Sequence, residues 1–264
     1  MKLIKPIGGD PSELCINIAE YLGCDCEYFP PMENRSPVLE AFYRAVNTGK
    51  KGGFIPVIVE INDVLAESAA LNTSEDRSGN IIELDREKID SYRRRLIRRT
   101  TDSDANEFFR KSIDELKIYN DPYALGTAPD EKIENGEAID FIRIPSSDLL
   151  YCEILIVKIP VSNPWEIAAW LPFGSKRYGH PSPKHIIAIA KRWYEKYGAV
   201  ICAVSYQTIQ FQLPKPIKSQ SEAYALAKEQ YFFCQDICFE MIDQPLGTLA
   251  DSLMKSNVWY FWWD

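Results

Sequence analysis

Trp259-Tyr260-Phe261-Trp262-Trp263-Asp264 ends the chain, and five of these six residues are aromatic. A chain end this apolar would promote aggregation if it stayed in water, because exposed apolar patches associate. Burial of each ring contributes on the order of 1.5–3 kcal/mol. The stretch therefore predicts a strand locked into a hydrophobic core. Successive side chains of a strand point to opposite faces, so Trp262 and Trp263 cannot fill the same core, and one of them is a candidate to line a groove or a contact surface.

The segments before this stretch predict helices that complete the core. Ser182-Pro183 is typical of a helix start and Gly198 of a helix end, so we expect a helix over residues 183–197. Ser219-x-x-Glu222 is a capping box that begins another helix, and Thr248-x-x-Asp251 is a weaker one.

A β-hairpin is expected between these two helices, because polarity alternates there with the period of a strand. Its strands cover residues 199–206 and 209–213, and a further strand covers residues 150–159. The expected inward residues are Ile209, Phe211 and Leu213, and the expected outward residues are Gln210 and Gln212.

The first 72 residues predict a small unit of alternating strands and helices. Residues 54–61 are almost continuously apolar, which favours a strand buried on both faces, although Pro56 favours an edge position or a bulge. Asp10 is the expected N-cap of the first helix, and Gly23 is its expected end. The other expected elements are strands at residues 2–7 and 24–29 and helices at residues 36–49 and 62–71.

From residue 73 to residue 149 the apolar residues thin out and the charge rises. Two helices are expected there, at residues 86–99 and 103–117, followed by a loop at 121–133. We therefore predict an α+β protein in three parts. These are an N-terminal α/β unit (1–72), a charged helical insertion and linker (73–149), and a C-terminal α+β domain with an antiparallel sheet and packed helices (150–264).

Composition and charge narrow the class of protein. A length of 264 residues with 46% hydrophobic residues suits one large or two modest domains. The net charge of −8 argues against general affinity for nucleic acid or anionic membranes and favours a basic protein partner. Seven cysteines, an odd number, indicate reduced thiols rather than a disulfide framework. With neither a signal peptide nor a membrane span recognisable, we expect an acidic cytoplasmic protein.

Four features of the C-terminal part carry a family resemblance. They are Trp193-Tyr-Glu-Lys-Tyr-Gly-Ala199, Lys215-Pro216, Phe232-Phe233-Cys234-x-Asp236, and the ending Trp259-x-Phe261-Trp262-Trp263-Asp264. Together they resemble the uncharacterised bacterial family "domain of unknown function 4253" over roughly residues 150–264. Gln235 and Gln244-Pro245, both in the 235–247 loop, depart from the usual family pattern. The resemblance implies a fold neighbourhood and no established activity.

The two histidines, His180 and His185, are the first candidates for a chemical role, together with Asp236 and Asp264. His185 falls in the first turn of a helix, where the positive end of the dipole disfavours protonation and suits a base or a ligand. A polar loop and a solvated helix start are the plainer interpretation, which we favour. No short ligand spacing completes the pair, so neither a metal nor a cofactor is predicted.

Five arginines occur in the seven residues from Arg93 to Arg99. They could grip phosphates or an acidic partner, but acidic neighbours favour a salt-bridged, solvent-facing helix. Cys24, Cys26 and Cys234 are interpreted as small buried core residues.

The leading functional hypothesis is a non-catalytic cytoplasmic binding protein, in concrete form an immunity-type protein that recognises a basic protein partner. The alternative is an enzyme or a small-ligand binder with a cleft near Trp170 and His185, walled by the C-terminal aromatic residues. That alternative predicts a pocket in which the candidate side chains converge. A nucleic-acid binder that uses the arginine helix is a third, less supported reading, because no stacking aromatic residues accompany the arginines.

Overall fold

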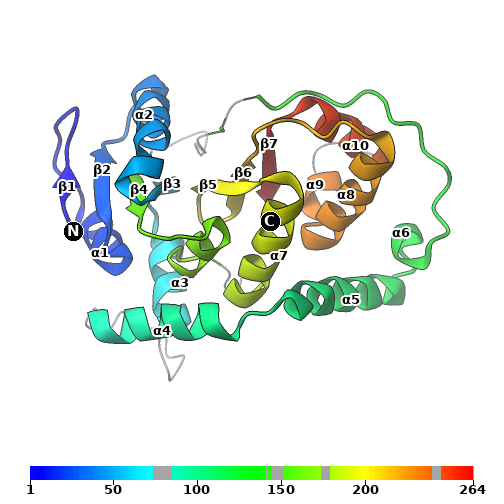
Figure 1. Cartoon of the computed structure of the whole chain (residues 1–264), viewed down its shortest axis with the longest axis horizontal. Helices are drawn as coiled ribbons and strands as arrows, with labels where there is room; N and C mark the ends of the chain where they lie inside the picture. The colour runs from blue at the N-terminus through cyan, green and yellow to red at the C-terminus, as the bar shows by residue number, and fades with distance from the viewer. Residues whose placement is uncertain (74–84, 141, 144–151, 174–178, 240–244, 264) are drawn as a thin grey trace.

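The structure, a computed structural model, describes residues 1–73, 85–140, 142–143, 152–173, 179–239 and 245–263. Its centre is one mixed sheet of seven strands in the order β1-β2-β4-β3-β5-β6-β7 (Figure 1). The strands β1 and β2 are parallel, as are β3 and β5, and every other neighbouring pair is antiparallel. The bounds are β1 Leu3–Ile4, β2 Asp25–Phe29, β3 Ile55–Glu60, β4 Ile154–Ile159, β5 Val200–Val204, β6 Thr208–Gln212 and β7 Val258–Trp262.

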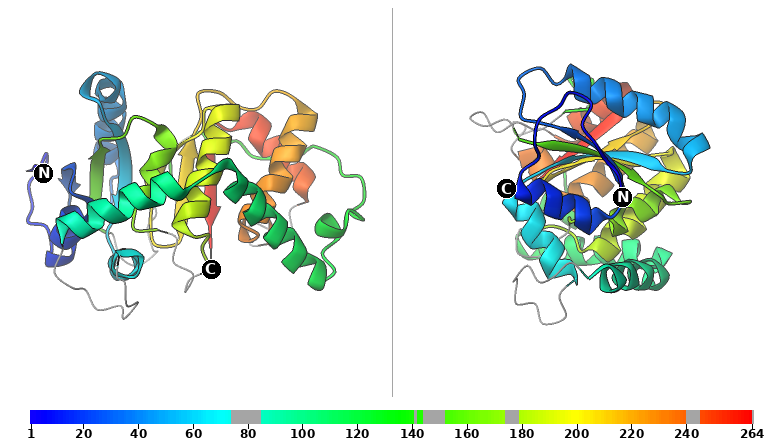
Figure 2. Two further views of the ribbon diagram at one scale, coloured as in Figure 1. Left: turned by 60° about the horizontal axis from the view of Figure 1, so that its bottom comes forward. Right: turned by 90° about the vertical axis from the view of Figure 1, so that its left-hand side faces the viewer.

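Helices cover both faces of this sheet, and Figure 2 shows α2 on one side and α1, α3 and α4 on the other. The larger core lies on the second side, where α7, α8 and α10 also pack. Helices α4 and α5 run end to end along the outside of this layer (Figure 1). The bounds are α1 Glu13–Leu22, α2 Ser36–Gly52, α3 Asp63–Thr73, α4 Arg86–Arg99, α5 Asp102–Ile118, α6 Pro122–Leu125, the 3-10 helix η1 Pro164–Ala169, α7 Pro183–Tyr197, α8 Gln220–Phe233, α9 Asp236–Phe239 and α10 Leu246–Lys255.

The fold is α+β, as the sequence predicts, with the antiparallel strands β5, β6 and β7 in the C-terminal part. One sheet runs through both ends of the chain, because β3 of the N-terminal part lies between β4 and β5. The division into residues 1–72, 73–149 and 150–264 stays a prediction, since a shared sheet does not show which part folds alone. Among the described helices, none is long and apolar enough to cross a membrane.

The aromatic end of the chain forms β7, as predicted. Trp259 and Phe261 are buried, and both rings pack against Trp193 of α7, with ring centroids 5.6 and 5.4 Å away respectively. Trp263 joins the same core through Phe233 of α8, at 5.4 Å. The last strand therefore closes a core that α7 and α8 prepare.

Four local expectations are wrong, and two of them concern the N-terminal part. Ser12, not Asp10, is the N-cap of α1, because its hydroxyl accepts the Cys15 N–H. Pro56 lies in an inner strand, which is possible because β5 pairs with β3 only further along, beginning at Ile58.

Gln210 is buried rather than outward, because the Arg143 backbone contacts it on this face of the sheet. Its amide accepts a hydrogen bond from the Arg143 N–H and donates one to the Arg143 carbonyl. The expected capping box at Thr248 is also wrong: α10 already begins at Leu246, so Thr248 lies inside the helix.

Candidate functional site

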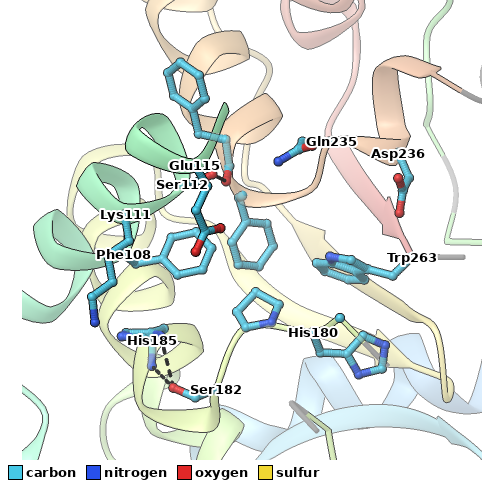
Figure 3. A pocket seen from close by; sticks show the side chains of 14 residues that line it. Phe108, Lys111, Ser112, Glu115, His180, Ser182, His185, Gln235, Asp236 and Trp263 are labelled. Atoms are coloured by element: carbon cyan, nitrogen blue, oxygen red, sulfur yellow. Dashed lines mark hydrogen bonds between the residues drawn. The ribbon is translucent and has the colours of Figure 1, made fainter. Parts of the chain in front are cut away.

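A pocket of about 630 Å³ lies between α5, the start of α7, and the segment that joins α8 to α9 (Figure 3). We call it the histidine pocket, because both histidines of the chain line it. Its lining residues are Phe108, Lys111, Ser112, Glu115, Gly179, His180, Pro181, Ser182, His185, Phe232, Phe233, Gln235, Asp236 and Trp263.

Helix α5 forms one wall of the histidine pocket. The helix begins with a capping box, in which the Asp104 carboxylate accepts the Thr101 N–H at 2.7 Å. Just beyond the middle of the helix, the buried Ser112 hydroxyl donates to the Phe232 carbonyl at 2.7 Å. That carbonyl lies in the last turn of α8, where the helix has no backbone donor for it. The bond therefore fixes α5 against the end of α8 and sets the width of the pocket.

His180 forms the floor beside Trp263. It is only 5% exposed, and its ring stacks on Phe173 with a centroid distance of 4.3 Å and an interplanar angle of 14°. Its edge meets Trp263 at 5.5 Å. Burial lowers the pKa of His180 to about 4, because a low-dielectric site disfavours the charged ring. The imidazole is therefore neutral at pH 7 and keeps both a donor and an acceptor nitrogen.

His185 lies in the first turn of α7, on the opposite side of the pocket from Asp236 (Figure 3). Ser182, the N-cap of α7, accepts the His185 N–H, and its hydroxyl lies 3.0 Å from His185 Nδ1. The ring also packs on Phe108, with centroids 5.3 Å apart. Burial lowers the pKa of His185, and the nearby Glu107 carboxylate only partly opposes the shift. This second imidazole is also neutral at pH 7.

Charged and amide groups stand around the neutral imidazoles. Asp236 begins α9, and Gln235 precedes it. Cys234 holds this turn against β7, because its thiol donates to the Trp262 carbonyl at 2.9 Å. Glu115 and Lys111 project from α5 and are exposed, and Lys111 forms an ion pair with Glu107 at 2.6 Å. The pocket thus combines aromatic walls with hydrogen-bonding groups of several kinds.

The structure brings together three of the four candidate catalytic residues, His180, His185 and Asp236, as well as the binding candidate Trp263. Asp264 lies outside the described residues. The expected polar loop is wrong for His180, which is buried between two aromatic rings. His185, at the helix start, is partly buried. The roles of all these residues stay predictions.

The other two binding candidates lie elsewhere. Trp170 does not line the pocket, and its ring lies beneath the Arg93 guanidinium at 5.1 Å. Trp262 alternates with Trp263 onto the opposite face of the sheet, the face on which Val258 packs. One tryptophan of the pair therefore lines a pocket, as the strand pattern suggested, and it is Trp263.

The α5 wall was not among the sequence candidates. Phe108, Ser112 and Glu115 recur at intervals of four and three residues, which places them on one face of the helix. That periodicity was available from the sequence. Which part of the protein this helix face contacts depends on the hydrogen bond from Ser112 to Phe232, 120 residues further along the chain.

The cysteines examined as candidate nucleophiles or ligands are core residues. Cys24, Cys26 and Cys234 are all buried. Burial raises the pKa of Cys24 to about 11 and also raises the pKa of Cys26 and of Cys234, so the thiols are protonated at pH 7. Within the described part of the chain, no group of three or more His, Cys, Asp or Glu side chains could hold a metal ion.

Comparison with known proteins finds a match to one protein family and gives no information on activity. Residues 155–264 match the model of the family "Domain of unknown function (DUF4253)". No curated protein and no solved structure matches the chain. The matched range includes both histidines, Asp236 and Trp263, whereas the α5 wall lies before it. The match confirms the family resemblance predicted from the sequence, over residues 155–264 of the chain.

Proposed function

We propose that this chain is a cytoplasmic small-ligand-binding protein whose ligand occupies the histidine pocket. The observation that carries the proposal is the convergence of four separate segments on one cavity of about 630 Å³. Pockets that bind small molecules usually enclose about 300–1,000 Å³ and combine apolar walls with a few polar groups. The rings of Phe108, Phe233 and Trp263 supply such walls here, and the two imidazoles supply polar groups.

The arrangement favours recognition over covalent chemistry. The Ser182 hydroxyl lies 3.0 Å from His185 Nδ1, but among the described contacts no third group orients this imidazole as a nucleophilic triad requires. Among the described lining residues there is no cysteine. Neutral imidazoles with fixed neighbours are instead good donors and acceptors toward a polar ligand. A flat ligand with hydrogen-bonding edges fits these groups, because its faces can stack on the aromatic walls.

Recognition of a basic protein partner, in the immunity-type form that the net charge suggests, stays a prediction. The side-chain contacts described above concern the histidine pocket, and none of them tests the binding of a basic protein partner. The two ideas are separable, since a protein partner does not require an open pocket and a small ligand does.

A fragment screen tests the proposal directly. The probes are small heteroaromatic amides and carboxylic acids, observed by saturation-transfer NMR in the presence of the full chain. Glu115→Trp places a large ring at the pocket wall and should abolish the signals. Asp114→Trp is the matched control, because Asp114 is the adjacent exposed residue of α5 and does not line the pocket. The proposal fails if no fragment binds the wild-type chain, or if the same fragments bind the Glu115→Trp variant equally well.

A further inference from the structure

Four arginines of α4 form an exposed surface on the outermost layer of the molecule. Arg94, Arg95, Arg98 and Arg99, which we call the arginine surface, are all exposed. They occupy two neighbouring rows of the helix, since residues four apart lie above one another. Residues 94 and 99 are separated by roughly 7.5 Å along the axis at 1.5 Å per residue. Four positive charges therefore lie within less than two turns.

The inner side of α4 is firmly attached, so the direction of the arginine surface is fixed. Arg93 is buried, and its guanidinium donates to the carbonyls of Leu22 and Tyr21 at 3.2 and 2.8 Å. Ile89 is buried beside it. The expected solvent-facing position is thus wrong for Arg93, which is buried against the end of α1, whereas its expected salt bridge is present, with Asp90.

The carboxylates near the arginine surface are occupied by other cations. Asp90 pairs with Arg86 and Arg93, at 3.7 and 3.4 Å. Asp102 pairs with Lys191 at 2.5 Å, and Asp104 with Lys184 at 2.6 Å.

Within the described ranges, the four guanidinium groups have no ion pair, and the side-chain contact of Arg94 is with the Ser91 hydroxyl at 3.1 Å. The salt-bridged helix expected from the sequence is therefore not what these four residues form.

The fold by itself does not call for this arrangement. Like charges four residues apart, such as Arg94 with Arg98 and Arg95 with Arg99, oppose helix formation. The helix dipole favours cations in the last turn, but lysine would satisfy it equally. Arginine differs from lysine in its planar fork of donors, which binds a carboxylate with two parallel hydrogen bonds.

We infer that the arginine surface binds an acidic segment of a protein partner. The net charge of −8 means that the rest of the chain is strongly acidic, which repels the dense charge of a nucleic acid over long range. A short acidic segment carries less charge and pairs at close range with the guanidinium forks. The net charge alone favours a basic partner, whereas the arginine surface favours an acidic one, because charge complementarity acts between the groups that are in contact. The inference is independent of the histidine pocket.

The test is fluorescence anisotropy with a labelled ten-residue polyglutamate peptide and the full chain. Replacement of all four arginines by glutamine should weaken binding by roughly tenfold or more, because each exposed pair changes affinity by about two- to fivefold. The control removes the same charge from exposed lysines elsewhere, as Lys50→Gln, Lys51→Gln, Lys117→Gln and Lys132→Gln. It should change the affinity by less than about threefold through net charge alone.

Three outcomes would overturn the inference. These are no binding of the peptide to the wild-type chain, equal loss of binding in the two quadruple variants, and tighter binding of duplex DNA than of the peptide. Circular dichroism of each variant, which should match the wild type, separates loss of the surface from loss of the fold.

Discussion

Arg93 is the residue whose replacement should most clearly separate a structural arginine from its exposed neighbours. Its guanidinium donates to the Leu22 and Tyr21 carbonyls at the end of α1 and lies over the rings of Tyr21 and Trp170. These carbonyls belong to the last turn of a helix and have no intrahelical donor. Arg93→Met keeps the apolar stem and removes every donor, so it isolates the polar contribution.

The expected loss can be built from these contacts. The Tyr21 carbonyl keeps a hydrogen bond from Arg86 at 3.1 Å, whereas the buried Leu22 carbonyl keeps only the weak one from the Cys24 thiol at 3.3 Å. Loss of the guanidinium hydrogen bonds to these carbonyls costs about 1–3 kcal/mol, and the lost cation–π contacts add roughly 0.5–2 kcal/mol. Burial lowers the pKa of Arg93, which shows that its charge is also costly to bury, and its removal offsets part of this loss. The sum is a destabilisation of about 2–3 kcal/mol.

Urea unfolding followed by tryptophan fluorescence measures this difference, as a lower transition midpoint at an unchanged slope. Arg94→Met is the matched control, since Arg94 is the next residue and is exposed. It should change the free energy of unfolding by less than about 0.5 kcal/mol. The reasoning is refuted if Arg93→Met is as stable as this control.

Three further predictions follow from the core and the pocket. Burial lowers the pKa of His180 to about 4, so between pH 4 and about pH 6.5 the unfolded chain binds a proton that the folded chain does not. The free energy of unfolding should therefore be highest above about pH 6.5 and fall toward pH 4, by up to about 1.4 kcal/mol per pH unit. Urea midpoints of the His180→Gln variant, measured over the same pH range, should lack this component. Deletion of residues 259–264 should abolish the cooperative thermal transition seen by circular dichroism, because it removes β7 and the rings that pack on Trp193; an unchanged melting temperature would contradict this. Gln210→Leu should cost about 1–3 kcal/mol in urea unfolding, because it orphans the N–H and carbonyl of Arg143, while Gln212→Leu, at the partly exposed end of the same strand, should cost less.

Elements set by local chemistry were predictable from the sequence. The helix over residues 183–197 begins after Ser182, whose side chain caps it, and ends at Gly198, whose φ of 73° suits a residue without a Cβ atom. The bounds of α4, Arg86–Arg99, match the predicted range for the same reason, with Asp85 as a side-chain cap. Each of these signals lies within a few residues of the feature that it specifies.

Features set by distant contacts were not predictable in the same way. The pairing of β3 with β4 joins strands about 100 residues apart, and hydrophobic pattern alone does not name the partner of a strand. The burial of Gln210 likewise depends on Arg143, which reaches it across the sheet face. The small-ligand hypothesis requires His180, His185 and Asp236 to converge, but only the fold decides that they line one cavity.

The charged middle segment of the chain contributes helix α5 to the histidine pocket, which its composition does not suggest. The matched family domain begins at residue 155, yet Phe108, Ser112 and Glu115 of α5 form a wall of the pocket whose other walls belong to that domain. Ser112 ties this wall to the end of α8 through the Phe232 carbonyl. A chain reduced to residues 155–264 would therefore keep the histidines but lose the side of the pocket that faces them. Under the proposed function, the ligand preference would depend on residues that the family match does not include, and we expect a chain with the same matched range and a different preceding helix to bind a different ligand.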